Sequence, residues 1–307
     1  MIERLAMPTR DEVGRALLQK LLKHGGTIKE FGVGEAVVDE IATELGLSAD
    51  QRSAHLETMY RKENRIKKSS LWHRLLFRAA DSLARGEFVS RPTRTIQLTG
   101  KREWMLTEKG FDEALQLNNI PTERKELLSV RSFEVQKIAK RIAESQKPPN
   151  YNPVEAAKKS AKREVESVLR SRGFRLAVVE AYGFSCAVCG LKMPSPDSLS
   201  WEVEAAHIVP NYAKGRDDIW NGVALCRLHH WAFDVGWFTI LDDYSLKVSE
   251  SINGLPEGYG VIGSYEFLKI LAGASAKLSL PNREGASPDP LAVRWHRQNI
   301  FSQRSFA

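Results

Sequence analysis

The sequence predicts an α+β protein with two domains, and three observations carry this prediction. The chain has 307 residues, which is enough for two hydrophobic cores. Apolar residues recur at helical spacing in the first third, and short alternating runs of β type occur in the last third. All three cysteines lie between residues 186 and 226. We expect residues 1–118 to form a first domain, residues 119–165 a basic helical linker, and residues 166–307 a second domain.

Composition and charge narrow the class of protein. A net charge of +7 and a pI near 9.2 favour partners that carry phosphate groups. No stretch is apolar enough to span a membrane, and residues 1–20 lack the apolar core of a signal peptide, so we expect a soluble, cytoplasmic protein. Three cysteines cannot complete a set of disulfides, and in a reducing compartment a close pair indicates a metal or redox site.

Capped helices are expected at the start of the first domain. Thr9 and Glu12 have the spacing of a capping box, in which each residue satisfies a free backbone N–H of the first helical turn. Ser48 and Gln51 show the same pattern. Apolar spacing predicts a longer amphipathic helix over residues 69–85.

A β-hairpin is expected after this long helix. Two β-like runs, at residues 88–89 and 103–106, are separated by a segment rich in arginine. Helices followed by a hairpin with a basic tip are typical of a winged helix. In that fold the helix over residues 69–85 would enter the major groove of DNA, and the wing at residues 91–102 would contact the backbone or the minor groove. The candidate DNA-binding side chains are Lys67, Lys68, Ser70, His73, Arg74, Arg91 and Arg94.

A short motif adds a family resemblance for this domain. Residues 104–110 read WMLTEKG and, with the helix that contains Trp72, resemble the amino-terminal winged-helix domain of Mrr-like restriction proteins. The resemblance covers about residues 7–117 and implies double-stranded DNA as the partner. Trp72 has two interpretations: it contacts the methyl group of a modified base, or it lies in the core, as its helical phase favours.

The connecting region is basic. Residues 121–172 have a helical pattern that the prolines at residues 148–153 must interrupt. Its cations either line a path for phosphate groups or form a solvated helix face. They are Lys158, Lys159, Lys162, Arg163, Arg170, Arg172 and Arg175.

Cysteine and histidine spacing is the most informative feature of the second domain. Cys186 and Cys189 form a Cys-x-x-Cys pair, and Cys226 with His229 offers a second pair at the same spacing. Together they make a tetrahedral Cys3His set, the donor set of a structural zinc ion, Zn²⁺. We expect this ion to stabilise a small domain whose hydrophobic core is otherwise thin.

Three more polar residues occur in order within the same region. His207 follows an apolar alternation that predicts the end of a strand, Asn221 comes next, and His230 lies on an expected helix. His229 and His230 are adjacent, and neighbouring residues on a helix point about 100 degrees apart. One of the two histidines can therefore serve the zinc ion while the other serves a second metal.

This order is similar to that of the HNH, or ββα-metal, endonucleases, in the subgroup that reads AHI, NG, LC, HxxFD and GxF, over about residues 182–250. The resemblance implies a fold with an N-terminal winged helix plus a C-terminal zinc-stapled ββα-metal (HNH) nuclease domain. It implies that His207 is the general base and that Asn221 holds the loop that orients His207. It further implies that His230 binds one catalytic divalent ion, Mg²⁺ or Mn²⁺.

One position departs from the family pattern. Many family members place Asp or His directly before the base as a second metal ligand, whereas this chain has Ala206 there. Asp234 lies four residues after His230 and shares its helical face. Glu204 is the alternative, but on an extended strand it lies on the face opposite His207, so we favour Asp234.

The two family resemblances together imply a restriction endonuclease that cuts DNA at modified, methylated sites. A restriction enzyme for an unmodified sequence is one alternative. A catalytically inactive DNA-binding regulator is the other, and Ala206 is the feature in its favour. One active site cuts one strand, so cleavage of a duplex suggests a homodimer or two successive nicks.

Overall fold

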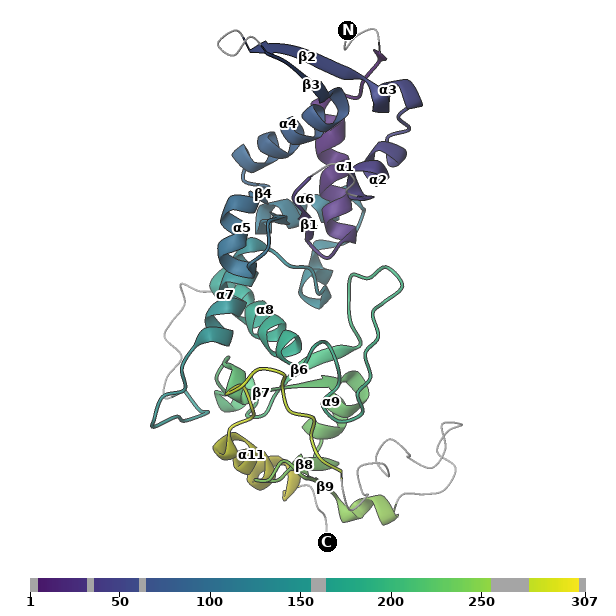
Figure 1. Cartoon of the computed structure of the whole chain (residues 1–307). Helices are drawn as coiled ribbons and strands as arrows, with labels where there is room; N and C mark the ends of the chain where they lie inside the picture. Colours follow the sequence, from purple (N-terminus) through teal and green to yellow (C-terminus); the bar gives the residue numbers. More distant parts are fainter. Residues whose placement is uncertain (1–4, 32–35, 61–64, 156–163, 255–275, 304–307) are drawn as a thin grey trace. The chain divides into compact units, whose positions relative to one another are not determined.

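The structure is a computed structural model, in which two compact units are distinguished (Figure 1). Unit 1 comprises Met1–Gln136 and Pro196–Ser200, and unit 2 comprises Lys137–Ser195 and Trp201–Ala307. Both contain helices and strands, which confirms the mixed α+β class. Among the described helices, none is long and apolar enough to cross a membrane. The described residues are 5–31, 36–60, 65–155, 164–254 and 276–303.

Unit 1 combines helices with a three-stranded antiparallel sheet of strand order β1-β5-β4 and a separate β2-β3 hairpin (Figure 1). Helix α1 packs against α4 and α6. The elements are α1 (Arg10–Lys23), β1 (Thr27–Lys29), α2 (Ala36–Glu44), α3 (Ala49–Ser53), β2 (His55–Tyr60), β3 (Arg65–Ser70), α4 (Leu71–Arg85), β4 (Val89–Ser90), α5 (Pro92–Thr99), β5 (Glu103–Leu106), α6 (Glu108–Leu117), a 3-10 turn (Thr122–Leu127) and the first turn of α7 (Phe133–Glu144).

The predicted helix caps are confirmed. Thr9 and Ser48 each accept a hydrogen bond from the backbone N–H three residues later, and Glu12 and Gln51 return the bond, as capping boxes require. Trp72 lies in the core with 2% of its surface exposed, and its indole N–H donates to the carbonyl of Val38 at 3.2 Å. The core interpretation of Trp72 is therefore confirmed.

The prediction of a hairpin with a basic tip is wrong. Val89 pairs with Leu106 in an antiparallel ladder, but helix α5 occupies the connection between the two strands. Pro92 stands in the first turn of α5, where its fixed φ favours a helix, and Gly100 ends the helix at a φ of 72°. Pro92 thus starts a helix in the segment where the sequence pattern predicted a hairpin tip. The winged-helix fold stays a prediction for unit 1.

Unit 2 contains two two-stranded antiparallel sheets, β6-β7 and β8-β9, and helices α8 and α9 both pack on β6 and β7 (Figure 1). The prediction that His207 ends a strand and that His230 lies on a helix is confirmed. The elements are the rest of α7, α8 (Glu164–Ala181), β6 (Val203–His207), 3-10 turns at Asn211–Ala213 and Ile219–Asn221, β7 (Gly222–Cys226), α9 (Arg227–Asp234), β8 (Phe238–Ile240), β9 (Leu246–Val248), a 3-10 turn at Glu250–Gly254, α11 (Pro290–His296) and a π-helical turn (Arg297–Phe301).

Gly222 allows helix α8 to lie close to strand β7. A Cβ atom at this position would lie 2.4 Å from Val178 and 3.1 Å from the ring of Phe174, both of which are fully buried on α8. No side chain fits in that space without displacing the helix. The glycine of the Asn-Gly pair therefore has a packing role, because it sets the distance between α8 and the strand that opposes His207.

His296 lies inside the core of unit 2. Its ring stacks on Phe233, with centroids 3.6 Å apart and planes 6° from parallel. One ring nitrogen lies 3.0 Å from the carbonyl of Phe233, and the other lies 3.0 Å from the hydroxyl of Thr239. A neutral imidazole satisfies both bonds, donating to the carbonyl and accepting from the hydroxyl. Burial lowers the pKa of His296 to about 4.

We expect protonation of His296 to destabilise the fold in acid. The pKa is about 4 in the folded chain and 6.5 for an ordinary histidine, so between these values the unfolded chain binds more protons. As pH falls from 6.5 toward 4, this residue should lower the free energy of unfolding by up to about 1.4 kcal/mol per pH unit. His296→Gln should remove that contribution, measured by urea unfolding of both proteins across this pH range.

The difference between the two proteins is the quantity to follow, because it cancels any acid lability that they share. Parallel curves of unfolding free energy against pH would contradict the prediction.

Candidate active site

The candidate site is built on the β6-β7 ladder and the helix that follows it. His207 is the last residue of β6 and pairs with Gly222, the first residue of β7. Strand β7 ends at Cys226, and α9 begins at the next residue. The end of β6, the 3-10 turn before β7 and helix α9 thus carry His207, Asn221 and His230, the three residues that the sequence pattern singled out.

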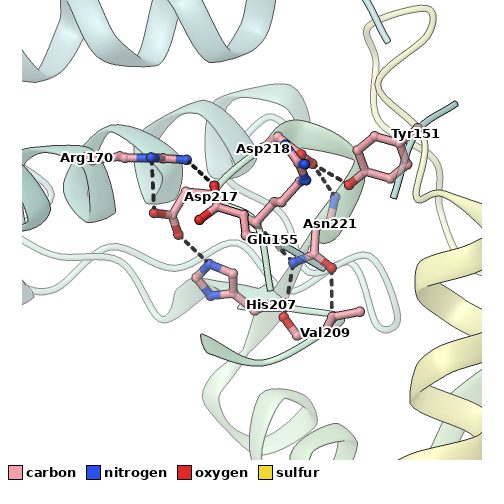
Figure 2. A network of polar contacts seen from close by, with 9 residues as sticks. Tyr151, Glu155, Arg170, His207, Val209, Asp217, Asp218 and Asn221 are labelled. Carbon is pink, nitrogen blue, oxygen red and sulfur yellow. Dashed lines mark hydrogen bonds and ion pairs between the residues drawn. The ribbon is translucent and has the colours of Figure 1, made fainter. Parts of the chain in front are cut away.

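Asn221 is fully buried and binds the backbone of the loop that follows His207. Its amide oxygen accepts from the N–H of Val209 at 2.8 Å, and its amide nitrogen donates to the carbonyls of Val209 and Arg216, both at 3.0 Å (Figure 2). Its own N–H donates to the Asp218 carboxylate, which also accepts from the hydroxyl of Tyr151. The geometry supports the loop-holding role expected of Asn221.

His207 has two neighbours that the sequence pattern did not indicate. Its Nε2 lies 2.9 Å from the Oδ1 of Asp217, and its ring stacks on Phe174 with centroids 4.0 Å apart. Arg170, on the same helix as Phe174, contacts the second oxygen of Asp217 at 3.3 Å (Figure 2). The only sequence signal for these contacts is a pair of aspartates shortly before Asn221.

His230 lies between two carboxylates. Its Nδ1 is 3.1 Å from Glu204, and its Nε2 is 3.5 Å from Asp234. Burial by itself lowers the pKa of His230, but the two carboxylates outweigh it and raise the pKa above its ordinary value. The hydrogen bond to His230 and the charge of Arg227 in turn lower the pKa of Glu204. Each ring nitrogen of His230 therefore has one carboxylate beside it.

The two candidates for a second metal ligand are thus both in reach of His230. Strand geometry favours Asp234 because it turns Glu204 away from His207, but a metal ligand needs to face His230, and Glu204 does so. Ala206 is fully buried and supplies no donor atom.

The Cys3His cluster forms as the spacing predicts. The donor atoms of Cys186, Cys189, Cys226 and His229 all lie within 4.8 Å of one another. His229 Nδ1 is 3.1 Å from the sulfur of Cys226 and 3.7 Å from that of Cys186. Around a tetrahedral zinc ion, neighbouring donor atoms are about 3.4–3.8 Å apart, so the four side chains fit such an ion.

One cysteine of the cluster, Cys186, is also in a form that suits a metal. Hydrogen bonding from Cys226, with a further contribution from His229, lowers the pKa of Cys186 to about 3, although burial opposes this shift. A thiolate is the form of cysteine that binds metals. His229 is buried whereas His230 is only partly so, which places the two histidines of the doublet in different surroundings.

The residues predicted to bind DNA lie on several elements of unit 1. Lys67, Lys68 and Ser70 belong to β3, and the hydroxyl of Ser70 caps α4 by accepting from His73. Lys68 is exposed and pairs with Glu57. The remaining three are also engaged: Arg74 contacts Ser69, Arg91 pairs with Asp81, and Arg94 lies over the ring of Phe133.

Six of the seven cations of the connecting region fall into three groups, and the seventh, Arg175, is exposed on α8. Lys158, Lys159, Lys162 and Arg163 lie outside the described residues. Arg170 belongs to the His207 site, because it contacts Asp217. Arg172 is buried, so for this residue a solvated helix face is excluded.

The site is built on two antiparallel strands, β6 and β7, followed by helix α9. A match to a known protein family covers the same segment. Residues 186–241 match the HNH endonuclease family, so this segment is an HNH endonuclease domain. The matched segment contains the three histidines and the asparagine discussed above, together with the whole Cys3His cluster.

Two other comparisons add little. No curated protein matches the chain. A solved structure, described as the modification dependent TagI restriction endonuclease, shares 25% sequence identity with a TM-score of 0.31. The alignment covers 43% of this chain and 39% of that chain, and at this TM-score we base no conclusion on it.

We expect His229 and His230 to differ in their effect on bound zinc. His229→Ala removes a buried donor of the Cys3His cluster and should abolish zinc retention and lower the melting temperature. His230→Ala, one residue away and outside the cluster, should retain zinc. Zinc content of the purified proteins by elemental analysis, with thermal unfolding, measures both effects. Equal zinc content in the two variants would contradict a Cys3His zinc site.

Proposed function

We propose that this protein is a DNA endonuclease that hydrolyses phosphodiester bonds, with His207 as the general base. The observation that carries the proposal is that one HNH endonuclease domain holds His207 at a strand end, an asparagine-bound loop behind it, and His230 on the adjoining helix. Imidazole has an ordinary pKa near neutrality, which suits it to accept a proton from water.

Hydrolysis of a phosphodiester also needs compensation of developing negative charge. His230 with Glu204 or Asp234 would hold a divalent ion, Mg²⁺ or Mn²⁺, and the mixed nitrogen and carboxylate donors fit either cation. Such an ion, when bound, offsets charge on the phosphorane and on the leaving oxygen. Glu204 is closer to His230 and less exposed than Asp234, so we infer that Glu204 is the principal second ligand.

Unit 1 is proposed to select the DNA site. The capped helix α4, the exposed Lys68 on β3 and the net charge of +7 support contact with a polyanion. A winged-helix mode, with α4 in the major groove, is the specific form of this proposal.

Cleavage at methylated sites is the finer part of the proposal. It rests on the pairing of a DNA-reading unit with an HNH cutter that the sequence motifs suggest. Because Trp72 is buried, its side chain is not available to contact the methyl group of a modified base. Restriction of an unmodified sequence is the alternative.

A second candidate function follows from Ala206, which is fully buried and offers no ligand at the position before His207. A chain with this residue would be a DNA-binding regulator if neither Glu204 nor Asp234 holds a cation. The regulator would bind DNA and release no cut ends.

We expect the wild-type protein to nick or linearise plasmid DNA in the presence of Mg²⁺ or Mn²⁺, with methylated plasmid preferred. His207→Ala should reduce the rate by a factor of about 100 or more, because a general base contributes about 10²–10⁴-fold. Gel electrophoresis of plasmids from methylating and non-methylating hosts measures both effects.

His24→Ala is the matched control, since His24 is a half-exposed histidine that pairs with Glu40 in unit 1. Equal cleavage of both plasmids would support the endonuclease activity and exclude its dependence on methylation. DNA binding without any cut product would favour the regulator. The ratio of linear to nicked product in early time points reports whether two copies act together.

Glu204→Gln is expected to weaken binding of the catalytic ion about tenfold or more, and Asp234→Asn by less. The reason is the shorter contact of Glu204 with His230, 3.1 Å against 3.5 Å. Calorimetric titration of each variant with Mn²⁺ measures the affinity without relying on cleavage, and zinc content checks that the Cys3His cluster is intact. The opposite ranking would assign the role to Asp234.

A further inference from the structure

The surroundings of His207 restrict which of its nitrogens can accept a proton. Its Nε2 lies 2.9 Å from Oδ1 of Asp217, which as a carboxylate can only accept a hydrogen bond. The proton shared by the pair therefore belongs to Nε2, and Nδ1 carries the free lone pair. Within the part of the chain that the structure describes, no hydrogen bond engages Nδ1. The side chain retains 15% exposure, which leaves it accessible from solvent.

Asp217 is itself held by a charged chain of contacts. Arg170 contacts the other oxygen of Asp217 through Nε and reaches Glu155 through Nη2, both at 3.3 Å (Figure 2). Arg170 and Phe174 stand four residues apart on α8, so they share one helix face. Helix α8 therefore supplies both Phe174, which stacks on the ring of His207, and Arg170, which contacts the carboxylate beside Nε2 of His207.

The backbone that carries Asp217 is also fixed. Gly215 approaches the carbonyl of Val209 so closely that a Cβ atom would lie 1.7 Å from the oxygen. Arg216 donates its N–H to Pro153 and accepts from Asn221 through its carbonyl. Asp217 therefore occupies a rigid loop position, and its contact with His207 is not that of a mobile surface side chain.

We propose that Asp217 is a positioning residue that holds His207 in the Nε2–H tautomer, so that Nδ1 is the nitrogen that takes the proton from water. This inference rests on the proposed role of His207 as general base. Arg170, which Glu155 holds from its other side, orients the carboxylate of Asp217. Asp217 does not touch the DNA or the attacking water and acts through His207 alone.

Hydrolysis of the phosphodiester needs water as its only co-reactant. An O–H bond of water breaks and its proton goes to Nδ1 of His207, while the water oxygen bonds to phosphorus. The bond between phosphorus and the 3′ oxygen breaks, and that oxygen takes a proton from solvent. The imidazolium of His207, stabilised by the negative charge of Asp217, then releases its proton to solvent.

The test compares Asp217→Asn, Asp217→Glu and His207→Ala with the wild type, using plasmid cleavage with enzyme in excess of DNA. We expect Asp217→Asn to slow cleavage about 10- to 100-fold, by analogy with outer partners of functional histidines. Affinity for DNA and zinc content should not change. Asp217→Glu should restore part of the rate.

Asp242→Asn is the matched control, since Asp242 is a half-exposed aspartate of the same unit that pairs with Arg294 and Arg297. If His207→Ala is inactive while Asp217→Asn keeps the wild-type rate, the positioning role is overturned and the proposed function stands.

A second measurement does not depend on cleavage. Nitrogen-15 NMR of histidine-labelled protein, with His207 assigned through the His207→Ala variant among the seven histidines, reports the tautomer directly. We expect Nε2–H in the wild type and a mixture of tautomers in Asp217→Asn. A wild type that is inactive on all DNA would overturn the proposed function. The NMR result would still decide whether Asp217 sets the tautomer, and an Nδ1–H tautomer in the wild type would refute it.

Discussion

The amide of Asn221 is the interaction on which the rest of the site depends. It is fully buried and satisfies three backbone groups, the N–H and carbonyl of Val209 and the carbonyl of Arg216. Each of these groups would cost about 1–3 kcal/mol if left without a partner in the interior. The carbonyl and N–H of Val209 set the direction of the chain as it leaves His207, and the carbonyl of Arg216 sets the position of Asp217. One side chain therefore determines the geometry of the base and of its carboxylate partner together.

The Cys3His cluster provides a second constraint at the other end of the same ladder. Cys226 ends β7 and His229 lies in the first turn of α9, so the cluster fixes the angle at which the helix leaves the strand. His230 follows directly, and the helix turns it toward Glu204 on β6. A metal in the cluster would thereby position a residue that is not one of its ligands. This is a physical reason for two adjacent histidines with different surroundings.

Helix α8 packs against the His207 end of this ladder. Phe174 and Val178 pack against Gly222, and Phe174 and Arg170 reach the His207 site from the same helix. The packing of α8 therefore also sets an electrostatic contact, because the helix that buries Phe174 against Gly222 brings the guanidinium of Arg170 to Asp217. A change in the spacing of α8 and β7 would alter both.

The sequence by itself determined the features that depend on spacing within a few residues. These include the two capping boxes, the Cys-x-x-Cys and Cys-x-x-His pairs, the strand end at His207 and the helix that carries His230, because hydrogen bonds of a helical turn and tetrahedral chelation are local. Only the tertiary structure decided that α5 fills the expected wing, that Glu204 faces His230, and that Asp217 and Arg170 meet at His207. Arg170 and Asp217 are far apart in the chain, and the packing of α8 on the β6-β7 ladder, which no local pattern encodes, brings them together.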